Sequence, residues 1–155
     1  MVSAESQPAP DAEAVIARHW PYDAPPSPEL VTAALDAVDE LVHYAGNASR
    51  RRTGVGSAPQ LYRLLAGLLD ATDRLPQLLD QLAAHTRGWG AGDDIRHDRH
   101  RSNPADSVAA GELAAEEAAA QLTAAARDID RVTQRLGYAR QSLSHLYHAT
   151  GGEQR

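Results

Sequence analysis

Residues 104–149 read PADSVAAGELAAEEAAAQLTAAARDIDRVTQRLGYARQSLSHLYHA, and this stretch decides the fold that the sequence predicts. Every seventh residue from Val108 to Leu143 is apolar. The residue three positions after each of these is also apolar or is glycine. A seven-residue repeat of this length predicts one long helix, Pro104–Ala149, with a straight apolar seam that another helix must cover. The bulky members of this seam, our candidate interaction residues, are Leu122, Ile129, Val132, Leu136, Leu143 and Leu146.

Local signals support the same helix. Asn103 can serve as its N-cap, Pro104 suits the first helical position, and Asp106 stands where a capping carboxylate would. Acidic residues gather in the first half and arginines in the second, which complements the helix macrodipole. The first half has small residues at most seam positions, so we expect a partner backbone to approach closely there.

Two further helices are expected before the long one. Ser27-Pro28-Glu29 is a helix start, and one apolar face predicts a helix over Ser27–Gly46. Leucines at helical spacing predict another over Ser57–Thr86. Pro76 should kink this helix rather than break it, because the leucines keep their phase across the proline. A break, with Asp73 capping a new helix, is the alternative.

The predicted fold class is all-α. We expect an antiparallel three-helix bundle with a long C-terminal helix, and a short helix between Asp11 and Trp20 as a candidate fourth member. The chain has 155 residues, which fits a single helical domain over residues 11–149. Residues 1–10 are expected to be a disordered N-terminus and residues 150–155 a flexible tail.

Composition excludes several function classes. The net charge of −6 disfavours a general nucleic-acid binder. Without a cysteine the chain has no disulfide, thiolate metal site or cysteine nucleophile. No apolar run approaches the ~20 residues of a membrane span, and Met1–Pro10 has neither the cationic start nor the apolar core of a secretory signal. A cytoplasmic location is therefore expected.

The connection Arg87–Ser102, RGWGAGDDIRHDRHRS, holds the densest chemistry. Its three glycines predict a flexible segment, and the candidate metal ligands are Asp94, His97 and His100. Interleaved arginines would lower the affinity for a cation. A solvated, charge-balanced connection is the simpler interpretation, and a metal- or small-ligand-binding bundle centred on residues 93–100 is the alternative.

A basic joint, Arg50-Arg51-Arg52, is expected between the first two long helices. It could contact phosphate or an acidic partner. Since no aromatic or base-reading residues stand near it in the sequence, a solvated linker is the preferred interpretation and nucleic acid an unlikely partner. No catalytic template is present, so neither enzymatic activity nor a cofactor is expected.

The stretch LPQLLDQLAA (Leu75–Ala84), the connection rich in His, Asp and Arg, and the Ala-rich terminal helix together resemble small helical proteins of high-GC actinobacteria. This resemblance implies no function. The sequence therefore predicts a non-catalytic interaction or scaffold protein that associates with itself or with another protein along the 104–149 seam.

Overall fold

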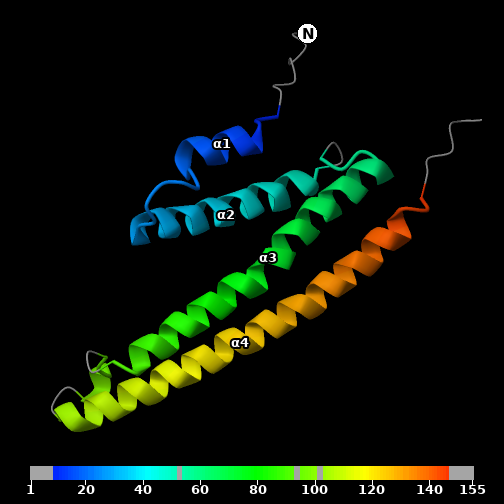
Figure 1. The fold of residues 1–155 in the computed structure, drawn as a ribbon. Helices are drawn as coiled ribbons and strands as arrows, with labels where there is room; N and C mark the ends of the chain where they lie inside the picture. Colours follow the sequence, from blue (N-terminus) through cyan, green and yellow to red (C-terminus); the bar gives the residue numbers. More distant parts are fainter. Residues whose placement is uncertain (1–8, 52–53, 93–94, 101–102, 147–155) are drawn as a thin grey trace, which may run out of the picture. The chain divides into compact units, whose positions relative to one another are not determined.

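The structure is a computed structural model that describes residues 9–51, 54–92, 95–100 and 103–146 (Figure 1). These residues form the α-helices α1 (Ala12–His19), α2 (Pro28–Ser49), α3 (Ala58–Gly90) and α4 (Pro104–Leu143), with a short 3₁₀ helix η1 (Asp98–His100). The described ranges contain no β-strand. The predicted all-α fold with a long C-terminal helix is confirmed.

Backbone contacts divide the chain into two compact units, Met1–Gly54 and Val55–Arg155. The sequence had led us to expect one domain over residues 11–149. Each unit is described by itself.

The first unit contains α1 and α2, and each begins at a side-chain cap. Asp11 Oδ1 accepts hydrogen bonds from the backbone N–H groups of Glu13 and Ala14, at 3.0 and 3.4 Å. Ser27 Oγ accepts from the N–H of Leu30 at 3.2 Å, so the predicted helix start is confirmed. The capping oxygens satisfy N–H groups that have no partner within the helix.

Helix α2 does not end at Gly46, as the sequence had suggested, but continues to Ser49. A tight turn follows, in which the N–H of Arg51 donates to the carbonyl of Ala48 at 3.1 Å and that of Gly54 donates to Arg51 at 2.8 Å. A Cβ atom at Gly54 would collide with the Ala48 carbonyl oxygen. The turn that ends the helix therefore requires Gly54, which lies eight residues after Gly46, where the sequence had placed the end.

The second unit is an antiparallel hairpin of α3 and α4, which lie side by side along their length (Figure 1). Helix α3 runs through Pro76 without a break, so the prediction of one helix is confirmed. It also extends four residues beyond Thr86, to Gly90. Gly88, Trp89 and Gly90 are thus helical rather than part of a flexible connection.

Helix α4 ends at Leu143 instead of Ala149, and residues 147–149 lie outside the described residues. The N–H of Ser144 donates to the carbonyls of Arg140 and Gln141. Its hydroxyl donates to the Gln141 carbonyl at 2.6 Å, a local bond that competes with continued helix. Asn103 is the N-cap by position, but its side chain donates to Asp106 at 2.7 Å and caps no backbone N–H.

Candidate association surface

Helices α3 and α4 meet along two rows of side chains on each helix. Near the connection, a Cβ at Gly90 would lie 2.9 Å from the Cβ of Ala115, so the two backbones approach closely, as the small residues predicted. Near the open end, Arg140 Nη2 donates to the hydroxyl of Tyr62 at 3.0 Å. We call these rows the hairpin seam. Its members, all buried or half-buried, are Tyr62, Leu65, Leu69, Thr72, Pro76, Leu79, Ala83, Thr86 and Gly90 on α3, and Ala115, Ala119, Leu122, Ala126, Ile129, Thr133, Leu136, Arg140 and Leu143 on α4.

The hairpin seam contains only part of the seam predicted from the sequence. Four of the six candidate interaction residues lie in it: Leu122, Ile129, Leu136 and Leu143. The other two do not, because the side chain of Val132 is 49% exposed and that of Leu146 is 57% exposed. The second row of the hairpin seam follows the first by four residues rather than three. It includes Thr133 and Arg140, which a search for apolar repeats passes over.

The core of the hairpin consists of small side chains. The buried apolar residues in the described part of the chain are Ala83, Ala119 and Ala126. Every leucine, isoleucine, valine, tyrosine and tryptophan that the structure describes is at least partly exposed. A helix normally buries its apolar stripe against another element. These helices therefore carry more apolar surface than their mutual contact covers.

One side of the hairpin is polar. Arg87 Nη2 donates to Thr123 Oγ1 at 3.2 Å, and Arg87 Nε lies 4.0 Å from Glu116 Oε1. Residues seven apart share a side of a helix, so steps of seven from these three residues trace this side. We call it the polar edge. It consists of Ala66, Asp73, Asp80 and Arg87 on α3, and Glu116, Thr123, Asp130 and Gly137 on α4.

The opposite side carries no charge, and we call it the apolar edge. It consists of Leu61, Leu68, Leu75, Leu82 and Trp89 on α3, and Ala118, Ala125, Val132, Ala139 and Leu146 on α4. Among its bulky members, Leu68 is 45% exposed and Trp89 is 61% exposed. Four members of the α3 row are among the leucines that predicted this helix, Leu61, Leu68, Leu75 and Leu82, but their spacing alone did not separate them from the seam.

A second exposed apolar face lies on α2, in the first unit. Its side chains recur at helical spacing and are between 38% and 64% exposed: Leu30, Val31, Leu35, Val38, Leu41 and Val42. These are the residues that the sequence analysis assigned to a buried helix face. The first unit alone does not bury them.

Of the predicted metal ligands, only His97 has its side chain described. Among the described residues, no group of three His, Asp or Glu side chains could hold a metal ion. Asp94 lies outside the described residues, and of His100 only the backbone is described. His97 ties the connection to the start of α4 instead. Its N–H donates to the Ser107 carbonyl and its carbonyl accepts from Ser107 Oγ, both at 2.9 Å. Its Nδ1 accepts from the N–H of Arg99 at 3.2 Å.

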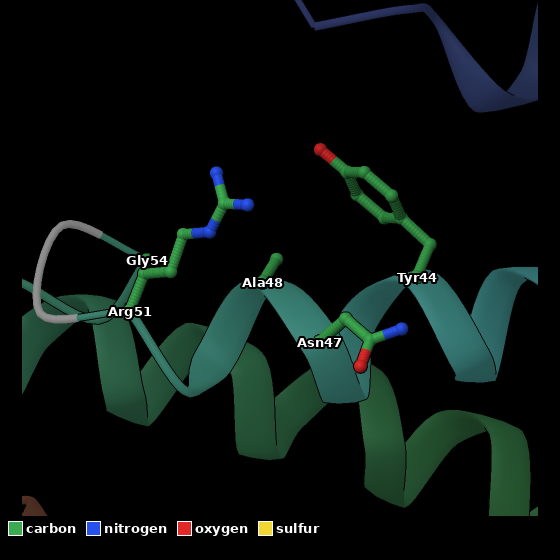
Figure 2. A pocket seen from close by; sticks show the side chains of 5 residues that line it. All are labelled: Tyr44, Asn47, Ala48, Arg51 and Gly54. Atoms are coloured by element: carbon green, nitrogen blue, oxygen red, sulfur yellow. The ribbon is translucent and has the colours of Figure 1, made fainter.

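The basic joint lies at the end of α2. Arg50 and Arg51 are exposed, and Arg52 lies outside the described residues. Figure 2 shows Tyr44 and Arg51 pointing to the same side of the helix end, around a hollow of about 300 Å³ that Asn47 also lines. The sequence analysis found no aromatic residue near these arginines. Arg51 follows the end of α2 at Ser49, and the turn there brings it to the side of Tyr44.

The open end of the hairpin combines a hollow with a buried polar atom. Arg140 places its guanidinium carbon 4.7 Å from the centre of the Tyr62 ring, a cation–π geometry. Its Nε is buried and has no hydrogen-bond partner among the described residues. A cavity of about 370 Å³ lies beside this pair, lined in part by Leu143 and by Leu146 of the apolar edge.

No helix in the described ranges is long and apolar enough to cross a membrane. In comparisons with known proteins, no family model, curated protein or solved structure matches the chain. The resemblance to actinobacterial helical proteins therefore remains a prediction.

Proposed function

We propose that this protein is a non-catalytic helical association protein, and that the apolar edge of its α3–α4 hairpin receives helices of another chain. One observation carries the proposal. The edge is apolar at all ten positions, and its bulky side chains are exposed or only half-buried. Exposed apolar surface of this extent is typical of protein–protein interaction sites.

The apolar residues outside the hairpin seam support the same proposal. Helices that only make a hairpin need apolar residues on the seam side alone, and their remaining sides are free to be polar. Here α3 and α4 each carry a further apolar row beside the seam, and both of these rows lie on the same side of the hairpin. A surface so arranged fits one or two helices packed lengthwise, as in a helical bundle.

The other functions considered from the sequence have less support. The backbone of His97 is hydrogen-bonded to Ser107 of α4, and its Nδ1 accepts from the N–H of Arg99, which supports a structural role for this residue. The arginines at the end of α2 have Tyr44 as an aromatic neighbour but no set of base-reading side chains. We place the association in the cytoplasm, in keeping with a chain that has no cysteine.

Photo-crosslinking in the cell that makes the protein tests this proposal. Val132, on the apolar edge, and Leu113, which is 72% exposed on another side of α4, are replaced in separate full-length chains by p-benzoylphenylalanine. We expect irradiation to give intermolecular adducts from position 132 and few from position 113. Equal adduct yields from the two positions would contradict the proposal.

A further inference from the structure

We infer that the occupant of the apolar edge is a second copy of this chain, and that the two hairpins form a four-helix bundle. This inference rests on the proposed function, because it names the partner of the same surface. It adds a specific pairing, in which α3 of each copy packs against α4 of the other.

The shape of the apolar edge fits a second copy. Its α3 row is bulky, with four leucines and Trp89, whereas its α4 row has alanine at three of five positions. Large and small side chains on facing helices interdigitate and fill the space between them. A two-fold axis parallel to the helices sets the bulky row of each copy against the small row of the other, so both contacts gain this complementarity.

The levels of the residues along α3 and α4 also fit this pairing. The contact of Gly90 with Ala115 fixes which residues of α3 and α4 lie at the same level along the hairpin. From that contact, steps of seven place Ala83 level with Leu122 and Pro76 level with Ile129. Leu75 and Val132, and likewise Leu82 and Ala125, therefore lie within two residues, ~3 Å, of the same level. A two-fold axis parallel to the helices preserves these levels, so Leu75 of one copy faces Val132 of the other.

The length and area of the apolar edge also fit a second hairpin. The α3 row runs over 29 residues, from Leu61 to Trp89, which is ~42 Å of helix. Across two helices ~10 Å apart the edge covers roughly 800 Å² per copy, the area that a standard specific interface needs on each partner. The 22 residues of α2 make only ~33 Å of helix, less than the length of the edge. A second hairpin has both the length and the width.

The charges on the two edges favour pairing through the apolar edge. The apolar edge contains no ionisable residue, so two copies bring no like charges together there. The polar edge has four carboxylates, on Asp73, Asp80, Glu116 and Asp130, against one cation, Arg87. Two polar edges would repel each other. Pairing through one edge only gives a closed dimer instead of a growing fibre.

Cysteine cross-linking tests the pairing, because the full-length chain has no cysteine of its own. Leu75→Cys and Val132→Cys are prepared as separate chains with tags of different size, mixed, and oxidised. We expect the mixed 75–132 disulfide to form at least about tenfold faster than the disulfide between Leu75→Cys and the control Leu113→Cys, because the dimer raises the local thiol concentration. Helicity by circular dichroism checks that each variant is folded.

Two results would overturn the inference. A dominant 75–75 disulfide within Leu75→Cys alone would show that α3 packs against α3, as a two-fold axis perpendicular to the helices requires. Rates equal to the Leu113→Cys control would show that no second copy covers the edge. Photo-crosslinks from position 132 to a different protein would then leave the proposed function standing, whereas their absence as well would remove both.

Discussion

At the residue scale, two glycines near the end of α3 have opposite roles although they are two positions apart. A Cβ at Gly88 would meet no atom within 4 Å, whereas one at Gly90 would lie 2.9 Å from the Cβ of Ala115. Gly90 is therefore required by the close approach of α4, and Gly88 is not. The sequence shows two identical residues in a GWG motif and gives no means to tell them apart.

The two substitutions should consequently change stability in opposite directions. We expect Gly88→Ala to raise the free energy of unfolding by about 0.5–1 kcal/mol, since alanine favours the helix. Gly90→Ala should lower it by roughly 1–3 kcal/mol, because α4 must move away. Denaturant unfolding followed by circular dichroism measures both. A stabilising Gly90→Ala would contradict the close helix contact at the connection.

The start of α2 gives a pH-dependent prediction. The backbone N–H of Glu29 and the Ser27 hydroxyl hold the pKa of the Glu29 carboxyl below its ordinary value of 4.5. A lowered pKa means that the charged carboxylate stabilises the folded chain above pH 4.5, and that this contribution is lost as the pH falls through the folded value. Glu29→Gln should lower the thermal midpoint at pH 7 and have no effect at pH 2. An equal decrease at both pH values would mean that the charge of Glu29 is not responsible.

At the scale of the element, α3 shows how a helix keeps a proline in its interior. Pro76 lies in the hairpin seam and is half-buried there. It cannot donate to the carbonyl of Thr72, and its ring crowds the preceding turn. The seam residues before and after it, Thr72 and Leu79, are nevertheless both half-buried.

We expect Pro76→Ala to stabilise the protein, because alanine restores the missing backbone hydrogen bond. The thermal midpoint should rise or stay the same. A clear decrease would show that the proline ring, or the bend it imposes, is needed for packing against α4.

The seam of α4 can be tested at Leu136, which faces α3 and is half-buried. Leu136→Ala should lower the free energy of unfolding by about 2 kcal/mol through loss of packing. The matched control is Leu113→Ala, at a leucine 72% exposed on another side of the same helix, which should change it by less than about 0.5 kcal/mol. Equal effects of the two substitutions would rule out the assignment of the seam.

At the scale of the whole molecule, the sequence predicted the elements better than the surface that each one buries. Capping residues and leucine spacing gave all four α-helices and the continuity of α3 through Pro76. The seven-residue repeat from Val108 gave one row of the hairpin seam, but it assigned Val132 to the buried side. An apolar repeat reports all the apolar surface of a helix. It cannot separate the part that faces the next helix of the chain from the part left for another partner.

The same limit applies to the polar residues. The seam includes Arg140, which is accommodated because Tyr62 supplies a hydroxyl and an aromatic face. That partner lies 78 residues away in the sequence. Similarly, the backbone of His97 is held by hydrogen bonds to Ser107 that no local pattern reveals.

The central claim is that the apolar edge of the hairpin is an association surface, and its inferred occupant is a second copy of the chain. The most direct test is the molar mass in solution, measured by light scattering over a range of concentrations. We predict that the full chain approaches twice its mass of 16.6 kDa, that Leu68→Asp on the edge reduces it to the monomer mass with helicity retained, and that Leu113→Asp leaves it unchanged. A mass of 16.6 kDa for the full chain at every concentration, or an unchanged mass for Leu68→Asp, would contradict this account.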